Sequence, residues 1–580
     1  MPADATPPAF GSDVVAETLR RLELPFIALN PGASYRGLHD SIVNYLGNER
    51  PRLLLCLHEE HAVAVAHGWA KVTEQPLAVA LHANVGLMHA TMAIFNAYCD
   101  RVPMLILGAT GPLDAARRRP WIDWIHTSAD QGALVRESIK WDDQPASAAA
   151  AVESLLRGHQ LTTAYPAAPV YVCLDAGLQE AALEAPLELP DVTRYRPPAP
   201  PAPAAADVER VLELLDAASR PLLLLGRVGR SQAGWDARVR VAERLGALVL
   251  TDLKTGASFP TAHPLNAAPP GTFLSAEAQA LLRSADLVVA LDWIDLGGTL
   301  RQAWGGKPAG ARVVSCTLDD TLHNGRSKDH FELAPVDLAV RSHPDLLVAA
   351  LDEQLAGREP APGWSPNVEP DPPAPEPGHG AGIPLRDLAA ALRDAIAGRA
   401  SCLVRLPLGW DGRDLQVAGP LDYLGQDGGA GLGSGPGMAV GAALALRGSG
   451  RIPVAVLGDG DFLMAATALW TAAHYRLPLL VVVANNRSFF NDEVHQERVA
   501  LHRGRPVENR WIGQHIRDPD PDLAALACSL GLEGIGPVEE ASALPEALAS
   551  AVELVSGGAA VVLDVRVGTR GYPTSPKADA

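Results

Sequence analysis

The sequence has few cysteines and no long apolar run, and both absences limit what the protein can be. Its six cysteines are scattered through 580 residues without a C-x-x-C pair, which predicts small core residues of a reduced, cytoplasmic protein. No stretch approaches the roughly 18 apolar residues that a membrane span needs. The first residues, MPADATPPAFGSD, lack the basic and apolar regions of a secretory signal, so we expect a cytoplasmic location.

Basic residues are too few and too dispersed for a nucleic-acid surface. The formal net charge is -19, and no basic stripe could neutralise a row of phosphates. The hydrophobic content of 48% and the charged content of 20% are typical of a soluble globular protein. At 580 residues the chain is too long for a single core. We therefore expect several domains and neither a nucleic-acid nor a membrane partner.

Proline is concentrated in two stretches, residues 184–206 and 357–383, which predicts two extended linkers. They divide the chain into expected domains at 1–183, 207–355 and 384–580. Short apolar runs that are typical of strands alternate with helix-like segments in these domains. Such alternation predicts an α/β fold with three doubly wound parallel-sheet domains, whose sites lie at the carboxyl ends of the strands.

Residues 456–493 carry the clearest chemical pattern. An apolar run ends in Gly458-Asp459-Gly460, and a second apolar run delivers Asn485-Asn486 after a helix-like segment. Because parallel strands end at the same edge of a sheet, the Asp459 and Asn486 side-chain oxygens can converge on a hard divalent cation. The glycines and the following helix N-terminus suit a diphosphate. The alternative is an ordinary strand-helix-strand unit in which Asp459 caps the helix.

The spacing of these two halves resembles a known cofactor motif. G-D-G followed about two dozen residues later by N-N is similar to the motif that binds thiamine diphosphate (thiamine pyrophosphate, ThDP). The resemblance implies that Asp459, Asn486 and the main-chain carbonyl of Ser488 bind Mg²⁺, which bridges the protein and the diphosphate. It also implies cofactor contacts by Gly458, Asp459, Gly460, Asp461 and Asn486.

Residues 58–61, HEEH, invite a zinc interpretation that their spacing does not support. Zincins need H-E-x-x-H so that two histidines share a helix face, whereas His58 and His61 are three residues apart. The stretch HEEHAVAVAHGWAKVTEQP instead resembles the start of the pyrimidine-binding domain of ThDP enzymes. The resemblance assigns Glu59, nine residues before Gly68, as the carboxyl group that promotes loss of the thiazolium proton. A surface glutamate at a helix N-terminus is the alternative.

Residues 81–107 resemble benzoylformate decarboxylase and its relatives, in which a histidine of an L-H-S sequence faces the reacting carbon. His82 matches that histidine and is the candidate acid or base, with a structural loop histidine as the alternative. His89, further on, is expected to be structural or to support the site from behind the residues that contact substrate. In benzoylformate decarboxylase a serine directly follows Asn-Pro-Gly, whereas this chain has Ala33 and only then Ser34. Ala33 and Ser34 are both candidate substrate contacts. Because neither matches the family's serine in both type and position, the contact of that serine with the substrate carboxylate is not assigned directly to this chain.

Residues 425–446 are rich in glycine and then become a helix of small residues. The resemblance places Leu432 at the apolar position on which ThDP bends into its V shape, and backbone carbonyls near Ala430 against the aminopyrimidine. A flexible loop is the alternative. Asn491 follows the metal motif into a region that partly covers the cofactor in these enzymes, where it could meet substrate or remain solvated.

The middle domain carries weaker signals. It resembles the central domain of the pyruvate oxidase and acetolactate synthase group, some members of which hold FAD or an adenine nucleotide. Residues 226–230, GRVGR, do not match G-x-G-x-x-G, so FAD is possible but not favoured. Trp293 follows a predicted strand and could select substrate, although aromatic residues at strand ends more commonly serve packing.

The resemblance as a whole implies a ThDP- and Mg²⁺-dependent enzyme that acts on a 2-oxo acid. The expected reaction is decarboxylation with possible carboligation, like that of benzoylformate decarboxylase, which makes the protein a lyase or a transferase. Acetolactate synthase-like ligation, carbon-carbon cleavage of a 1,2-dicarbonyl as in cyclohexane-1,2-dione hydrolase relatives, and a non-catalytic ThDP-binding subunit are the alternatives. Because the family builds each site from two subunits, a homodimer or homotetramer is implied. The motifs do not identify the substrate.

Overall fold

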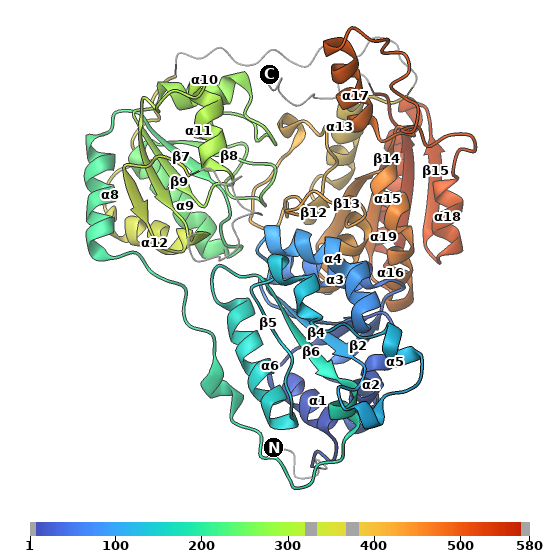
Figure 1. Cartoon of the computed structure of the whole chain (residues 1–580). Helices are drawn as coiled ribbons and strands as arrows, with labels where there is room; N and C mark the ends of the chain where they lie inside the picture. Colours follow the sequence, from blue (N-terminus) through green and yellow to red (C-terminus); the bar gives the residue numbers. More distant parts are fainter. Residues whose placement is uncertain (1–6, 320–332, 367–381, 570–580) are drawn as a thin grey trace.

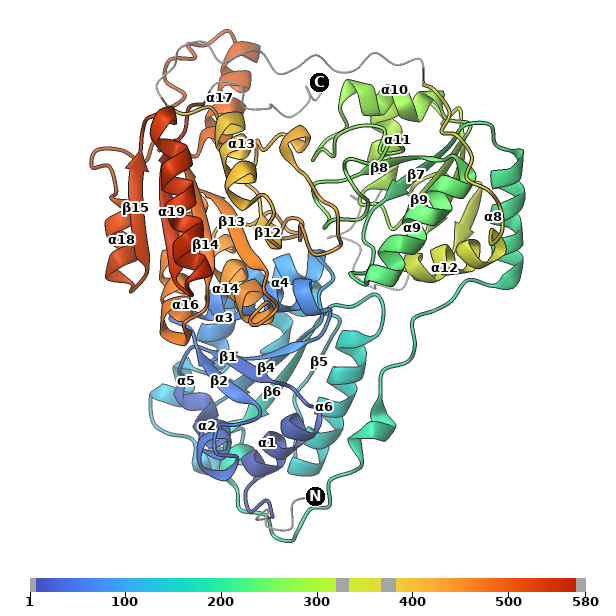
Figure 2. The same cartoon turned by 180° about the vertical axis from the view of Figure 1, so that it is seen from behind.

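The computed structural model describes residues 7–319, 333–366 and 382–569. It contains three sheets, one in each third of the chain, and the strands that neighbour each other pair in parallel. Helices cover both faces of each sheet in Figures 1 and 2. The prediction of an α/β fold with three parallel sheets is therefore confirmed, while the exact domain boundaries stay predictions.

The N-terminal sheet has the strand order β2-β1-β3-β4-β6-β5. The chain starts at β1 and places later strands on either side of it, as a doubly wound sheet requires. Its strands are β1 (Phe26–Leu29), β2 (Arg52–Leu55), β3 (Leu77–Ala80), β4 (Met104–Thr110), β5 (Trp141–Asp143) and β6 (Pro169–Asp175). Its helices are α1 (Gly11–Arg21), α2 (Arg36–Asp40), α3 (Glu59–Thr73), α4 (Ala83–Cys99), α5 (Ile122–Ile125), α6 (Ala148–Thr163) and α7 (Ala176–Glu180).

The central sheet has the order β11-β10-β9-β7-β8 and its own hydrophobic core. Its strands are β7 (Pro221–Leu225), β8 (Leu248–Thr251), β9 (Leu287–Leu291), β10 (Arg312–Cys316) and β11 (Leu338–Val340). Its helices are α8 (Ala205–Ala217), α9 (Gln232–Leu245), α10 (Ala276–Ser284), α11 (Leu296–Trp304) and α12 (Pro344–Gln354).

The C-terminal sheet has the order β12-β13-β14-β16-β15. Its strands are β12 (Ser401–Arg405), β13 (Ile452–Gly458), β14 (Leu479–Asn485), β15 (Glu533–Val538) and β16 (Ala560–Arg566). Its helices are α13 (Leu385–Ile396), α14 (Gly435–Ala445), α15 (Asp459–Ala465), α16 (Leu469–Tyr475), α17 (Phe490–His502), α18 (Leu523–Ser529) and α19 (Leu544–Ser556).

Glycines let the N-terminal and C-terminal domains pack closely through α3 and α14. A Cβ on Gly68 would lie 2.0 Å from the carbonyl oxygen of Met438, and one on Gly441 would lie 1.9 Å from that of Val65. The two helix backbones therefore touch where any larger residue would separate them. One hydrophobic core runs through both domains at this contact. Figure 2 shows α3 and α14 side by side between the blue and orange domains.

Two further sequence expectations concern exposure. Five of the six cysteines are buried, but Cys528 on α18 is exposed, so the expectation of core cysteines is wrong at that position. Among the described helices none is long and apolar enough to cross a membrane.

Candidate active site

Three neighbouring strands of the N-terminal sheet bring together Glu59, Ser34 and His82. Glu59 follows β2, Ser34 follows β1 and His82 follows β3, and these strands are adjacent in the order β2-β1-β3. Ser34 Oγ lies 2.9 Å from His82 Nδ1 and also accepts the Ala83 backbone N–H at 3.1 Å. Ala33 precedes this contact in a short 3-10 turn. The carboxyl-terminal ends of these strands thus bring together the carboxyl group of Glu59, the hydroxyl group of Ser34 and the imidazole group of His82.

His82 has a second imidazole beside it. The rings of His82 and His126 meet edge to face with centroids 4.7 Å apart. Burial lowers the pKa of His82, and the neighbouring His126 lowers it further. His126 could not be selected from the sequence, because it directly follows the four-residue helix α5 and carries no motif of its own. The site therefore holds two facing imidazole groups, the side chains that most commonly serve as proton donors and acceptors.

Glu59 is the first residue of α3 and is only 6% exposed. Its Oε2 lies 3.0 Å from Nδ1 of His89 on α4. A Cβ on Gly86 would lie 3.0 Å from Glu59 Oε1, so the carboxyl group reaches α4 because Gly86 has no side chain. Glu59 is therefore a buried carboxyl group rather than the exposed helix-end glutamate of the alternative interpretation.

The C-terminal sheet brings the second set of predicted residues together. Asp459 follows β13 and Asn486 follows the adjacent strand β14. The backbone N–H of Ser488 donates to both Asp459 Oδ2 at 3.0 Å and Asn486 Oδ1 at 2.9 Å, so these oxygens converge. Burial raises the pKa of Asp459 to about 6, although backbone N–H groups, including that of Ser488, oppose this rise. A bound cation would stabilise the ionised carboxylate there.

The glycines of the G-D-G sequence differ in what surrounds them. A Cβ on Gly458 would meet no atom within 4 Å, which leaves open space beside Asp459. A Cβ on Gly460 would lie 2.5 Å from the ring of Phe489. Gly458 thus allows a ligand to approach the backbone, and Gly460 allows Phe489 to pack against the start of α15.

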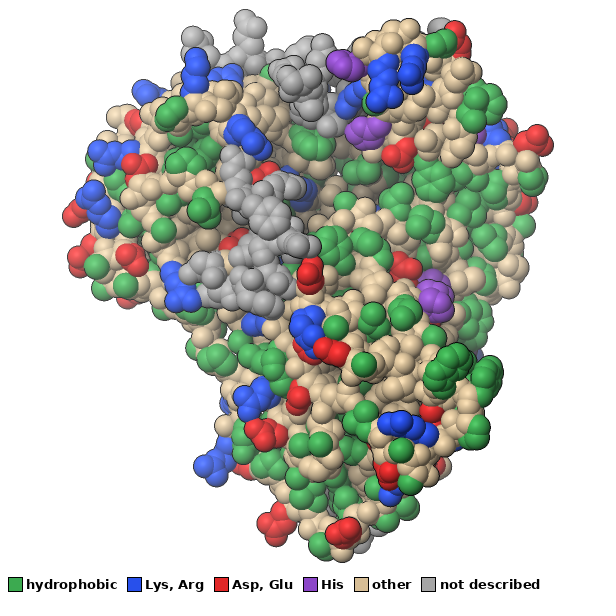
Figure 3. Space-filling model, viewed as in Figure 1, with side chains coloured by type: hydrophobic (Ala, Val, Ile, Leu, Met, Phe, Trp, Pro, Cys, Tyr) green, Lys and Arg blue, Asp and Glu red, His purple; other side chains and the backbone are tan. Residues whose placement is uncertain are grey.

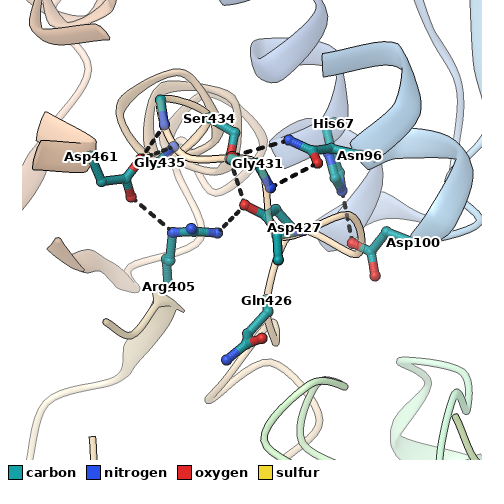
Figure 4. A network of polar contacts seen from close by, with 12 residues as sticks. His67, Asn96, Asp100, Arg405, Gln426, Asp427, Gly431, Ser434, Gly435 and Asp461 are labelled. Atoms are coloured by element: carbon teal, nitrogen blue, oxygen red, sulfur yellow. Dashed lines mark hydrogen bonds and ion pairs between the residues drawn. The ribbon is translucent and has the colours of Figure 1, made fainter. Parts of the chain in front are cut away.

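Asp461 uses its side chain to hold the glycine-rich loop. Its Oδ1 accepts the Gly433 N–H at 2.7 Å, and its Oδ2 lies 3.0 Å from Nε of Arg405. Arg405 also contacts Asp427, which accepts the N–H of Ala430 at 2.8 Å (Figure 4). The carboxylate of Asp461 therefore supports the loop that carries Ala430 and Leu432, whereas the motif implied a direct cofactor contact.

The N-terminal domain holds the same loop from the other side. The Asn96 side chain exchanges two hydrogen bonds of 3.3 Å with the backbone of Gly431. Lys71 donates to the Gln426 carbonyl and to Asp100, whose other partner is His67 at 2.7 Å. Figure 4 shows the contacts of Asn96 with the loop and of His67 with Asp100 at the junction of the two domains. The loop is therefore anchored from both domains, which contradicts the flexible-loop interpretation.

A cavity of about 350 Å³ adjoins the converging oxygens. Its lining includes the buried Glu493 of α17, whose carboxylate accepts the Ser488 hydroxyl and lies 3.0 Å from His515 Nε2. Asn491, two residues earlier, is half-buried at the start of α17. Glu493 carried no signal in the sequence because it stands among other polar helix residues. Basic side chains gather over α17 in Figure 3, and Arg510 and Arg517 line the cavity.

Comparison with family models shows to which protein family these domains belong. Models of the thiamine pyrophosphate enzyme match the N-terminal TPP binding domain at residues 10–134, the central domain at 208–321 and the C-terminal TPP binding domain at 409–565. The chain belongs to the thiamine pyrophosphate enzyme family. This ThDP-dependent family includes decarboxylases and carboligases, and both ThDP-binding domains are present here.

Individual relatives of this ThDP enzyme are distant. It is 27% identical over 483 residues to benzoylformate decarboxylase of Pseudomonas aeruginosa, covering 82% of this chain and 85% of that protein. It is 25% identical over 586 residues to a probable chloroplastic acetolactate synthase 2 of Oryza sativa subsp. japonica, covering 96% and 83%. The solved benzoylformate decarboxylase of Polynucleobacter necessarius superposes with a TM-score of 0.79 at 20% identity, covering 98% and 100%, which shows a common fold.

The central domain of this ThDP enzyme gives no support to a substrate contact by Trp293. That residue is 7% exposed within the central core, and its indole N–H donates to Thr299 Oγ1 at 2.8 Å. The loop after β7 joins the domains instead, since Arg227 donates to the Cys99 carbonyl and Arg230 to the Tyr423 carbonyl. That FAD is not favoured stays a prediction.

Proposed function

We propose that this protein is a ThDP- and Mg²⁺-dependent enzyme that decarboxylates a 2-oxo acid, with possible carboligation, as benzoylformate decarboxylase does. The observation that carries the proposal is His82, which lies beside Ser34 and His126 at the sheet edge that also holds Glu59. The curated relative of that name, which matches 82% of this chain, supports it. The acetolactate synthase relative matches 96% of the chain, so carboligation is the second candidate reaction.

The residues of the C-terminal domain fit the metal and the diphosphate. Asp459, Asn486 and the carbonyl of Ser488 offer the oxygen ligands that Mg²⁺ prefers. The space beside Gly458 and the first N–H groups of α15 suit an anion. Leu432 and the backbone near Ala430, on the anchored loop, would hold the organic part of the cofactor.

The residues of the N-terminal domain account for proton transfer. When bound, the cofactor supplies a nucleophilic carbon and an electron sink for the bond that breaks. The buried carboxyl group of Glu59 would hydrogen-bond to the aminopyrimidine of the cofactor and share a proton with it. His82 and His126 exchange protons with the substrate side of the site, and burial keeps His82 largely neutral by lowering its pKa. Ser34 fixes the ring of His82, and Asn491 faces the substrate from α17.

We further propose a homodimer or homotetramer in which Glu59 of one chain serves the metal site of another. Large apolar side chains around both sets of residues are exposed in the single chain. Leu57 stands two residues before Glu59, and Met88 and Met92 lie on α4, where Met92 packs against Gly431. Met464 lies in the last turn of the helix that Asp459 begins. A second copy that covered them would complete the site and remove this apolar surface from water.

The test is carbon dioxide release from a panel of 2-oxo acids that includes benzoylformate. We expect turnover that requires ThDP and Mg²⁺ and that Glu59→Gln abolishes. Glu60→Gln is the matched control, because it removes a neighbouring carboxyl group from the same helix turn and should retain turnover. Equal inertness of the wild type and Glu59→Gln, with ThDP still bound, would favour the non-catalytic subunit. Undiminished Mg²⁺-dependent ThDP binding by Asp459→Ala would refute the metal site.

A further inference from the structure

Glu59 has a hydrogen-bond partner to which the proposed function gives no role. His89, in the second turn of α4, places its Nδ1 3.0 Å from Glu59 Oε2. An ionised carboxylate only accepts hydrogen bonds, so the imidazole donates its Nδ1–H. We infer that His89 is a positioning residue that orients the Glu59 carboxyl group toward the aminopyrimidine. The inference rests on the proposed function, because that function assigns Glu59 its contact with the cofactor.

The packing around the pair gives the two carboxylate oxygens different surroundings. Oε2 is held by His89, whereas Oε1 lies over Gly86, where a Cβ would be 3.0 Å away. The same Cβ would lie 3.1 Å from His82 Cβ, so Oε1 and His82 both approach α4 at Gly86. A hydrogen bond to one oxygen restrains rotation of the carboxyl group about its last bond. His89 thereby determines the direction of the oxygen that remains for the cofactor.

His58 in turn restrains His89, whose side chain is 58% exposed in the single chain. The two rings stack with centroids 4.9 Å apart and planes inclined by 23°. His58 is itself fixed, because it caps α3 by accepting the Glu60 N–H on Nδ1 at 3.2 Å. His58, which caps α3, therefore restrains His89, and His89 in turn holds the buried carboxyl group of Glu59.

A metal ion is the rival use of these three residues. One ligand atom from each of His58, Glu59 and His89 lies within 4.8 Å of the others. Stacked rings, however, direct their nitrogens side by side rather than toward one point. His89 Nδ1 and Glu59 Oε2 are also in direct contact, with no room for an ion between them. The geometry therefore favours the hydrogen bond.

Two amide substitutions of His89 separate a positioning role from a general structural one. Asparagine carries its N–H near the position of Nδ1, whereas glutamine carries it near Nε2. The primary measurement is the rate of hydrogen-deuterium exchange at the thiazolium carbon of bound ThDP, followed by NMR. Loss of a hydrogen bond to a charged group should slow this exchange about 10- to 100-fold in His89→Gln, and His89→Asn should restore it. ThDP affinity, followed by tryptophan fluorescence, should change far less than the exchange rate.

The possible outcomes also separate this inference from the proposed function. An exchange rate in His89→Gln equal to that of the wild type, together with slow exchange in Glu59→Gln, would overturn the role of His89 and leave the proposed function intact. Wild-type exchange in Glu59→Gln itself would overturn the proposed function. Two results together would replace the positioning role with a metal site. The apoprotein would bind Zn²⁺ stoichiometrically, and both His58→Ala and His89→Asn would abolish that binding. The exchange rates of the two amide variants would not differ.

Discussion

Replacement of Gly68 by alanine tests whether the contact between α3 and α14 is as close as the structure indicates. The new methyl group would start 2.0 Å from the Met438 carbonyl oxygen and 2.8 Å from its carbon. Both neighbours are helix backbone, so no side-chain rotation relieves the overlap. The two helices must move apart by about 1 Å, since Cβ atoms essentially never approach closer than 3.0 Å.

The expected cost follows from two opposing effects. Overpacking of this kind costs about 1–3 kcal/mol and occasionally more. Alanine recovers about 1 kcal/mol through its higher helix propensity. Because the overlap involves two backbones, we expect the upper part of the range and a net loss of about 2 kcal/mol, which corresponds to a melting temperature lower by about 4–8 °C for domains of this size.

Gly158→Ala is the matched control. Gly158 lies within α6, and a Cβ there would meet only side-chain carbons, the nearest at 3.3 Å. That substitution should leave the melting temperature unchanged or raise it slightly. Calorimetry of both variants gives the comparison, and ThDP titration should show weaker binding for Gly68→Ala alone, because α3 begins at Glu59. Equal melting temperatures for the two variants would refute the close packing of α3 and α14.

Three further predictions concern charged groups. Asp100→Asn leaves the buried Lys71 without an anionic partner and should lower the free energy of unfolding by about 3–5 kcal/mol. Burial raises the pKa of Asp100, but Lys71 and His67 together outweigh it and hold the pKa at about 2, so the wild type should lose this stabilisation as the pH falls from about 4 toward 2. His126→Gln removes a charge that lowers the pKa of His82, so the acid limb of the pH-rate profile should move to higher pH; an unmoved limb contradicts the pairing. Glu493→Gln should weaken Mg²⁺-dependent ThDP binding about tenfold or more in a magnesium titration. Unaltered affinity would contradict the support that Glu493 gives to Ser488, a proposed metal ligand.

The sheets could be predicted from the sequence because strands of parallel sheets are buried on both faces and therefore need continuous apolar runs. Every residue of β4, β6 and β14 is buried, and each is such a run. The start of α4 was harder to predict. The sequence favours a helix from residue 87, whereas α4 begins at Ala83 and places His82 at its N-cap. His82 and Gly86 are poor helix formers, so local propensity understates a helix that tertiary packing stabilises.

The candidate site could be predicted where a residue follows a strand and belongs to a motif. Glu59, His82, Asp459 and Asn486 all meet that condition. His126 does not, because it approaches His82 only when the loop after β4 folds over the sheet edge. Trp293 meets part of the condition, yet the same position at a strand end serves packing. A strand end thus identifies where a side chain lies but not whether it faces the core or the site.

Asp461 has a structural role beside the cofactor contact that the motif implies. Both of its carboxylate oxygens are used within the protein, for the glycine-rich loop and for Arg405. Asp459, two residues earlier on the same helix α15, is the expected metal ligand. A single helix turn therefore connects the metal site to the loop that carries Leu432. The proposed apolar support for the bent cofactor and the proposed ligands of the metal are consequently fixed relative to each other within one domain, and in the proposed oligomer only the group that activates the pyrimidine would come from elsewhere.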